Sequence, residues 1–342
     1  MKIGIITVYE PTTNFGSYLQ TYALKAVLEN LGHNVVVIQN CNTWKTFTNL
    51  LLRIQPKREF FLRFLKGFYF LSDVRKFKLV NKTELCLQDL DCLIYGSDEI
   101  WNLDNPYFQN DLFWGINIPR KIRQIAYAVS MGTMSENTFR NNKRYVESVE
   151  KFEYLFPRDK NTREILEKCL GKKFDIVCDP TLLIDVSLLS HSISVPKQKY
   201  LLVYTYGVNP YIENLIKQYA RKYGLLIVSP CFWHHWVDKV IECSALQFST
   251  LIAHAECVFT TTFHGAIFTL LNHKSNCILP MREKVRDIVI RLGENQHLID
   301  ESITFDEFER IMKMPYDSTD FDLRVSLFRD YSLKILMQTL IE

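Results

Sequence analysis

Short apolar runs alternate with longer amphipathic segments along most of the chain. Residues 2–9 (KIGIITVY) are a β-rich apolar run and predict a buried strand. Residues 17–32 (SYLQTYALKAVLENLG) repeat apolar positions with the helical period and end at Gly32, a residue that can cap a helix C-terminus. A second apolar run follows at 33–39. This order of strand, helix and strand predicts the start of a parallel, doubly wound sheet.

The same alternation continues through the rest of the chain. Its first part predicts strands at 91–96, 122–130, 152–158 and 175–179 and helices at 135–150 and 161–170. A polar segment with a proline, 191–199, then indicates a linker. The part after the linker predicts strands at 200–207, 224–230, 256–262 and 275–280 and helices at 210–222, 244–254, 265–273, 283–292 and 321–341.

We therefore expect an α/β protein of two Rossmann-like, doubly wound domains that face a cleft. The expected domains are 1–190 and 196–320, followed by a terminal helix, 321–342, that can pack back on the first domain. Residues 44–82 interrupt the first series and predict an inserted helical segment. Ligands of such sheets bind beyond the carboxyl ends of the strands, so the functional candidates are the side chains that follow each predicted strand.

Composition narrows the class of function. The 342 residues are 47% hydrophobic and 23% charged, as expected of a globular protein with a full core. A net charge of +3 argues against a dedicated nucleic-acid-binding protein. The nine cysteines contain no C-x-x-C pair, which favours reduced thiols over a zinc or redox site. With no signal-peptide pattern and no apolar run that could span a bilayer, we expect a cytoplasmic protein. Because no metal-binding motif appears, we expect neither a metal site nor a cofactor.

His264 lies where a predicted strand turns into a helix, within TTTFHGAIFTLL (260–271). A helix N-terminus offers free N–H groups and a partial positive charge, and both suit an anion. Gly265 lets the backbone approach a ligand closely. Histidine titrates near neutral pH and can act as a general acid or base. The alternative is a structural histidine that caps the turn.

Two loops of the first domain carry further candidates. Ser97 and Asp98 follow the strand at 91–96 and could bind a ligand, although either could equally be a helix N-cap. Asn14 and Gly16 precede the first helix and could hold a phosphate or a sugar hydroxyl. Neither the G-x-G-x-x-G nor the Walker pattern occurs in these loops, so a dinucleotide fingerprint is not supported.

Arginine and histidine residues supply other candidates. Arg158 ends a predicted strand, and its guanidinium suits phosphate or carboxylate; the alternative is a structural ion pair with the adjacent Asp159. The Asp-Pro pair at 179–180 predicts a turn that faces the cleft. His234 and His235 are adjacent and do not share a face, which argues against a single metal site, but they could line an acceptor pocket.

The segment 51–82 is both basic and aromatic. Such a stretch can lie on an anionic membrane surface, which would make the protein peripheral to the inner face of a membrane. The alternative is a helix that packs on its own domain and exposes a basic face to solvent. The residues concerned are Lys57, Arg58, Arg63 and Lys66 with Phe60, Phe61, Phe64 and Phe68.

Taken in order, these motifs resemble those of the polysaccharide pyruvyl transferase family. No single motif is diagnostic, but the ordered set is fairly specific and extends over about residues 3–300. The motifs are NFGSYLQTYAL (14–24), GSDEIWN (96–102), YAVSMG (127–132), FPRD (156–159) with TREIL (162–166), CDPTLLID (178–185), TTTFHGAIFTLL (260–271) and KVRDIVIRLG (284–293).

The resemblance implies a fold like that of GT-B glycosyltransferases. It also implies transfer of the pyruvyl unit of phosphoenolpyruvate to two hydroxyls of one sugar, which forms a cyclic ketal and releases phosphate. The implied acceptor is a precursor of a capsule, exopolysaccharide or cell-wall polymer, often attached to a lipid.

The resemblance also implies roles for individual residues. His264 matches the family's functional histidine, and Arg158 and Arg286 match two of its arginines. Better-studied members carry an arginine two residues before the histidine, where this chain has Thr262. The candidates for holding phosphoenolpyruvate are then Arg158, Arg282, Arg286 and Gly265. The candidates for orienting the acceptor are Asn14, Gly16, Ser97, Asp98, His234 and His235.

Two other functions fit the same sequence. A GT-B glycosyltransferase that uses a nucleotide sugar would share the architecture and differ in its donor. A glycan-binding relative without catalysis would account for the threonine at position 262.

Overall fold

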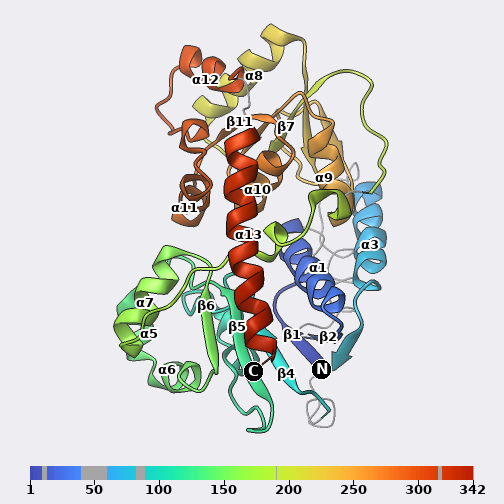
Figure 1. The fold of residues 1–342 in the computed structure, drawn as a ribbon. Helices are drawn as coiled ribbons and strands as arrows, with labels where there is room; N and C mark the ends of the chain where they lie inside the picture. Colours follow the sequence, from blue (N-terminus) through green and yellow to red (C-terminus); the bar gives the residue numbers. More distant parts are fainter. Residues whose placement is uncertain (10–13, 40–59, 82–88, 190, 315–317, 342) are drawn as a thin grey trace.

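The computed structural model describes residues 1–9, 14–39, 60–81, 89–189, 191–314 and 318–341. They form two parallel β-sheets, each covered by helices, and one long helix that runs past both (Figure 1). Parallel strands joined through helices are buried on both faces, which explains why the strands were recognisable as nearly continuous apolar runs. The predicted fold class, an α/β protein with two doubly wound units, is confirmed.

The first sheet has six parallel strands in the order β3-β2-β1-β4-β5-β6. The core of the sheet is β1, which aligns Ile3 with Val35 of β2 on one side and with Cys92 of β4 on the other. Its strands are β1 (Lys2–Ile6), β2 (Asn34–Gln39), β3 (Leu79–Asn81), β4 (Cys92–Tyr95), β5 (Arg123–Val129) and β6 (Tyr154–Pro157). Its helices are α1 (Phe15–Asn30), α3 (Phe60–Val74), α5 (Glu136–Asn141), α6 (Lys143–Val149) and α7 (Lys160–Leu170).

The second sheet has five parallel strands in the order β11-β10-β7-β8-β9. Polar side chains fix where its helices begin: Asn209 caps α8, Ser244 forms a capping box with Gln247 at α9, and Thr262 caps α10. Its strands are β7 (Tyr200–Tyr204), β8 (Leu226–Pro230), β9 (Lys239–Ile241), β10 (Cys257–Thr260) and β11 (Ser275–Ile278). Its helices are α8 (Pro210–Tyr223), α9 (Ala245–Ala253), α10 (Phe263–Leu271), α11 (Glu283–Arg291) and α12 (Phe305–Met312).

Two helices of the first half pack against the second sheet and join the halves. Phe15, the first residue of α1, stacks on Tyr204 of β7 and packs against Phe248 of α9, with ring centroids 6.1 Å and 5.1 Å away. Asp73 of α3 accepts a hydrogen bond of 3.0 Å from the Ala245 N–H and so caps α9. These contacts hold the two sheets in one arrangement, with the loops after their strands facing each other.

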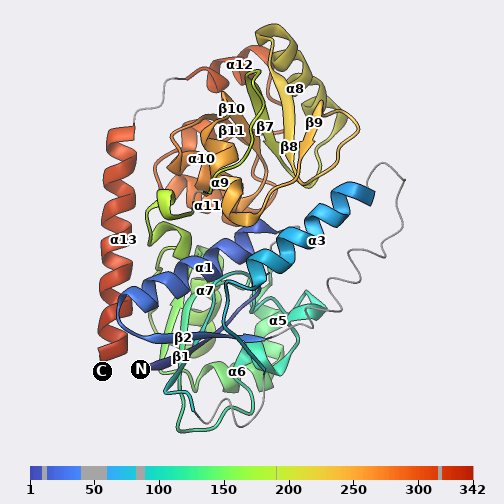
Figure 2. The ribbon, with the colours of Figure 1, turned by 90° about the vertical axis from the view of Figure 1, so that its right-hand side faces the viewer.

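The last helix, α13 (Ser318–Ile341), lies against both halves (Figure 2). Ser332 Oγ accepts a hydrogen bond of 2.9 Å from the Cys178 N–H, and the Thr339 carbonyl accepts one of 2.9 Å from Arg123 of β5. Farther up, Arg324 donates a hydrogen bond of 2.6 Å to the carbonyl of Leu292. This helix therefore ties the first sheet to the end of α11.

Several sequence predictions need correction. Residues 175–179 form no strand: Val177 donates one hydrogen bond of 3.1 Å to the Pro157 carbonyl of β6, and the Cys178 N–H bonds to Ser332 of α13. The predicted helix 135–150 is two helices that meet at Asn142, and the inserted segment contains β3 as well as α3. Strand β9 and helix α12 were not predicted. Residues 44–59 and 82 of the insert lie outside the described residues.

Candidate active site

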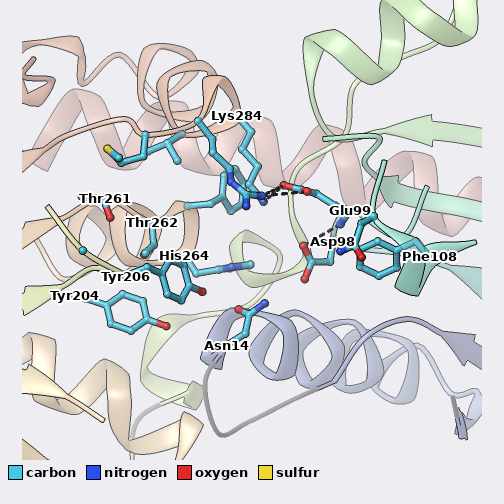
Figure 3. Close-up of a pocket in the computed structure, with 16 residues that line it drawn as sticks. Asn14, Asp98, Glu99, Phe108, Tyr204, Tyr206, Thr261, Thr262, His264 and Lys284 are labelled. Carbon is cyan, nitrogen blue, oxygen red and sulfur yellow. Dashed lines mark hydrogen bonds and ion pairs between the residues drawn. The ribbon is translucent and has the colours of Figure 1, made fainter. Parts of the chain in front are cut away.

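A pocket of about 320 Å³ lies between the two sheets (Figure 3). The loops before α1 and after β4 supply one wall, and the loops after β7, β10 and β11 supply the other. The first wall includes Asn14, Asp98, Glu99, Asn105 and Phe108. The second wall includes Tyr204, Tyr206, Thr261, Thr262, His264, Arg282 and Lys284. The pocket is therefore at the edge that doubly wound sheets use for ligands.

His264 lines this pocket from the first turn of α10. Thr262 begins the helix by accepting a hydrogen bond of 3.0 Å from the Gly265 N–H, so the backbone turns directly after β10. The imidazole is 8% exposed, and its Nε2 lies 3.7 Å from Asp179 Oδ2. Among the described residues, that nitrogen has no hydrogen-bond partner. The ring is thus held beside a carboxylate and still reaches the pocket.

A buried layer of polar groups lies behind His264. Asp179 is fully buried, and its Oδ2 accepts hydrogen bonds from Arg158 Nη1 at 2.7 Å and Ser97 Oγ at 2.9 Å. Its Oδ1 accepts hydrogen bonds from the backbone and side chain of Thr181. Burial alone would raise the pKa of Asp179, but the charges of His264 and Arg158 outweigh it and hold that pKa far below its usual range. The carboxylate is therefore a fixed negative charge behind the imidazole.

Gly16, in the first turn of α1, lies directly against the His264 ring. A Cβ at this position would be 1.8 Å from His264 Nδ1. Because that distance is far inside van der Waals contact, replacing Gly16 with alanine is expected to push the imidazole out of place and to lower turnover about 10²-fold, the cost of a misplacement of roughly 1 Å. Steady-state kinetics of Gly16→Ala would measure the effect. Unchanged turnover would show that the packing of the ring is unimportant.

Two cations of the second wall reach across the pocket to one carboxylate of the first wall. Arg282 Nη1 is 3.0 Å and Lys284 Nζ is 2.7 Å from Glu99 Oε1. Figure 3 shows Lys284 reaching toward Glu99, with dashed lines at the carboxylate. The Lys284 side chain is 15% exposed, whereas that of Arg282 is 60% exposed. Lys284 is thus the more enclosed of the two cations.

Glu99 should make the stability of the fold depend on pH. Burial alone would raise its pKa, but Lys284 and Arg282 lower it to about 2 from an ordinary value of 4.5. A carboxylate with a lowered pKa stabilises the folded state above its unfolded pKa and loses that contribution as the pH falls toward the folded pKa. In Glu99→Gln, the free energy of unfolding should therefore fall less steeply between about pH 4.5 and 2. Urea denaturation across this range measures the slope, and a slope equal to that of the unchanged protein would contradict the assignment.

The structure separates the predicted phosphate-binding residues. Arg282 lines the pocket, but Arg158 lies in the buried layer with a side chain that is 1% exposed, because it neutralises Asp179. Arg286 is 3.9 Å from Glu283 and faces a different hollow, shared with Asp300. Gly265 is buried against Thr260 and Thr262, where a Cβ would come within 2.1 Å of the Thr260 side chain. Of these candidates, only Arg282 lies on the pocket wall.

The predicted acceptor residues are separated in the same way. Asn14 and Asp98 line the pocket, and Figure 3 shows Asn14 rising from the start of α1 toward His264. Ser97 belongs to the buried layer. His234 stacks on Trp236 and lies 3.2 Å from the Thr205 carbonyl, and His235 is exposed beside Glu213. Neither histidine is among the residues that line the pocket.

Sequence reasoning missed several pocket residues. Lys284 lies in the first turn of a predicted helix and was not selected as a site residue. Glu99 lies next to Asp98, which was selected in its place. The signal that could have found Lys284 is its position two residues after Arg282, at the carboxyl end of β11. Tyr206 also lines the pocket, and 65% of it is exposed. Tyrosine at such a position offers an aromatic face and a hydroxyl to a ligand.

Within 1–9, 14–39, 60–81, 89–189, 191–314 and 318–341, no group of three or more His, Cys, Asp or Glu side chains is placed to hold a metal ion. Over the same residues, no helix is both long and apolar enough to cross a membrane.

A family model described as polysaccharide pyruvyl transferase matches residues 14–280, which include every residue of the buried layer and all of the pocket wall before Met281. No curated protein matches the sequence.

Several solved structures have a similar fold, and two of those described below hold UDP-GlcNAc or UDP. UDP-GlcNAc 2-epimerase from Methanocaldococcus jannaschii is 14% identical with a TM-score of 0.56, over 99% of this chain and 100% of that one. The enzyme of the same name from Neisseria meningitidis, bound to UDP-GlcNAc, is 11% identical with a TM-score of 0.56, over the whole of both chains. Arabidopsis thaliana UGT89C1, complexed with UDP, is 12% identical with a TM-score of 0.53, over 100% and 99%. At these identities the likeness shows a shared GT-B-like fold.

Proposed function

Since this chain belongs to the polysaccharide pyruvyl transferase family, we propose that it moves the pyruvyl group of phosphoenolpyruvate onto two hydroxyls of one sugar. The sugar is part of a polysaccharide or lipid-linked oligosaccharide precursor, the product is a cyclic ketal, and phosphate is released. The observation that carries the proposal is the enclosed His264, which has Asp179 behind it and shares one wall of the pocket with Lys284 and Arg282.

The pocket offers different surroundings to the two substrates. Lys284 and Arg282 are assigned to the phosphate and carboxylate of the donor, for which they would leave Glu99. We assign to this pair the phosphate-binding role of the arginine that other family members carry at the position of Thr262. In this chain Thr262 caps α10 instead. Asn14 and Asp98, with the hydroxyl of Tyr206, are assigned to the acceptor.

In the proposed reaction, a proton adds to the methylene carbon of phosphoenolpyruvate, and a first sugar hydroxyl attacks the resulting cationic C2 and loses its proton. The C2–O bond to phosphate then breaks, and a second hydroxyl of the sugar attacks C2, loses its proton and closes the ketal. Of the two protons that the hydroxyls release, one makes up for the proton added to the methylene carbon and the other leaves with the phosphate. His264 is assigned the proton transfers, and the Asp179 carboxylate lies behind it, 3.7 Å from Nε2.

Lys284 should contribute to donor binding, whereas Arg286 should not. Replacing Lys284 with methionine is expected to raise the KM for phosphoenolpyruvate about 10- to 100-fold, the cost of one lost charge-assisted hydrogen bond. Arg286→Met serves as the matched control, since Arg286 lies outside the pocket. Equal KM values for the two variants would remove Lys284 from the donor site.

The reaction itself is tested by incubating the protein with phosphoenolpyruvate and galactosyl or mannosyl acceptors. We expect inorganic phosphate and a product heavier by one pyruvylidene unit. Thermal protection separates the alternatives: phosphoenolpyruvate should raise the melting temperature, and UDP or GDP sugars should not. Protection by a nucleotide sugar alone would favour a glycosyltransferase. Acceptor binding without phosphate release would favour a glycan-binding relative.

The proposal includes a cytoplasmic location at the inner face of a membrane, close to a lipid-linked acceptor. In the part of the chain that the structure describes, the cysteines are free thiols. Phe68 of α3 is 63% exposed, whereas Lys57, Arg58 and the side chains of Phe60, Phe61, Arg63, Phe64 and Lys66 lie outside the description. Flotation with liposomes that contain anionic lipid tests this placement. If the protein does not float with these liposomes, α3 serves only to pack on its own domain.

A further inference from the structure

Helix α13 carries apolar side chains on two opposite faces. The inner face buries Phe321, Val325 and Leu336 against the rest of the chain. The outer face exposes apolar side chains, although packing against the rest of the chain uses only the inner face. Of the 14 large hydrophobic side chains that are exposed among the described residues, five belong to α13: Leu323 (58%), Leu327 (62%), Tyr331 (45%), Met337 (43%) and Ile341 (82%). Such a concentration on one element marks an interaction surface.

Six residues of the outer face have the spacing of a coiled-coil seam, and we call them the outer seam: Leu323, Leu327, Asp330, Lys334, Met337 and Ile341. They follow one another at intervals of four, three, four, three and four, which is the heptad pattern of alternating d and a positions. Four of the six are apolar, and the two in the middle carry opposite charges.

We propose that two copies of this chain pair through the outer seam, with their α13 helices antiparallel. The seam is symmetric about Ser332, which lies on the inner face. In an antiparallel pair related by a twofold axis at that level, Leu327 meets the partner's Met337, and Leu323 meets the partner's Ile341. Asp330 then meets the partner's Lys334, so each end of the seam is apolar and the centre contains two ion pairs.

The charges choose this arrangement over its alternatives. A parallel pair would place Asp330 opposite the partner's Asp330 and Lys334 opposite the partner's Lys334, and both contacts repel. An anionic membrane would meet Asp330 in the middle of its contact. Asp330 and Lys334 are both exposed, and among the described residues neither has an ion pair. Polar residues at the centre of a seam specify register and orientation, which is the role assigned to this pair.

The position of α13 leaves room for a partner. Figure 2 shows the helix along one side of the molecule, outside both sheets and parallel to its long axis. From Leu323 to Ile341 the helix rises about 27 Å, at 1.5 Å per residue. A second helix can therefore lie along the seam at the usual distance of about 8–10 Å between axes. The proposal does not depend on the catalytic function.

Sedimentation velocity with charge-reversed variants tests the pairing. The unchanged chain is expected to be a dimer, and Asp330→Lys and Lys334→Asp should each raise the dimer dissociation constant at least about tenfold, because each places like charges together. The double variant Asp330→Lys with Lys334→Asp should restore the dimer. Since both residues are exposed, the circular dichroism spectrum should change little and so report that each variant is folded. A monomeric unchanged chain, or single variants that dimerise as well as it does, would overturn the proposal.

Cysteine cross-linking tests the orientation. Leu327→Cys alone should give no disulfide dimer, because in an antiparallel pair the two new thiols lie about 15 Å apart along the axis. An equal mixture of Leu327→Cys and Met337→Cys chains should give one under mild oxidation, with the unchanged chain as the control for native cysteines. A disulfide dimer of Leu327→Cys by itself would show a parallel pair and contradict the register.

Discussion

Replacing His264 with glutamine is expected to lower pyruvyl transfer from phosphoenolpyruvate by about 10²–10⁴-fold, the range that a lost general acid or base usually costs. Glutamine keeps a similar length and polarity, so the ring of donors and acceptors around the pocket stays in place. The fold should remain, since only the group that exchanges protons is removed. The rate constant kcat at saturating donor and acceptor is the quantity to measure.

The size of the effect follows from where the imidazole lies. His264 is 8% exposed, so solvent water cannot easily replace it as proton donor. Asp179 Oδ2 lies 3.7 Å from its Nε2, while the pocket opens in front of the ring. A histidine that only capped the turn would not matter for kcat, because Thr262 already caps α10.

His235→Gln is the matched control for this experiment. It removes an exposed imidazole from the same half of the chain, at a position that the sequence suggested for the acceptor and the structure places outside the pocket. Its kcat and KM should equal those of the unchanged protein. Full activity in His264→Gln would remove the central assignment, and a comparable loss in His235→Gln would mean that the pocket is not where the acceptor binds.

The positions of single loops on the sheet could be predicted from the sequence because the apolar runs are local. The strand 256–262 and the helix after it fix where His264 lies relative to β10, and no distant residue is needed for that conclusion. The same reasoning placed Asn14 before α1 and Asp98 after β4, and both line the pocket.

The pairing of residues across the pocket could not be predicted, because it depends on contacts between distant parts of the chain. Arg158 looked available for phosphate, but Asp179, which neutralises it, lies 21 residues later. Lys284 and Glu99 meet from opposite walls, and nothing local to either residue indicates the other. Charged side chains at strand ends therefore identify the edge of a site more reliably than they identify its ligands.

The segment before Asp179 illustrates the same limit for secondary structure. Residues 175–179 have the composition of a strand, and Val177 does donate a hydrogen bond of 3.1 Å to the Pro157 carbonyl. The next N–H, that of Cys178, bonds to Ser332 of α13. A helix at the far end of the chain thus holds the backbone directly before Asp179.

Replacing Asp179 with asparagine is expected to lower the free energy of unfolding by about 3–5 kcal/mol, the usual cost of removing one partner of a buried ion pair. Arg158 would keep its charge in a site where its side chain is 1% exposed, and its contact with Asp98, at 3.9 Å, is too long to compensate. The variant should also lose activity, because the charge behind His264 is gone. Urea denaturation at neutral pH gives the free energy.

Two further variants separate burial of charge from loss of a hydrogen bond. Asp111→Asn is the control, because Asp111 forms an ion pair of 2.6 Å with Arg144 near the surface, where the Arg144 side chain is 62% and the Asp111 side chain 31% exposed. This substitution should lower the free energy of unfolding by no more than about 1 kcal/mol. Adding Arg158→Leu to Asp179→Asn removes the stranded charge and should recover part of the lost stability, although activity should stay low because Asp179 is still missing. If the double variant is less stable than Asp179→Asn alone, the stability lost in Asp179→Asn comes from the hydrogen bonds of Ser97 and Thr181. It would then not come from the unpaired charge of Arg158.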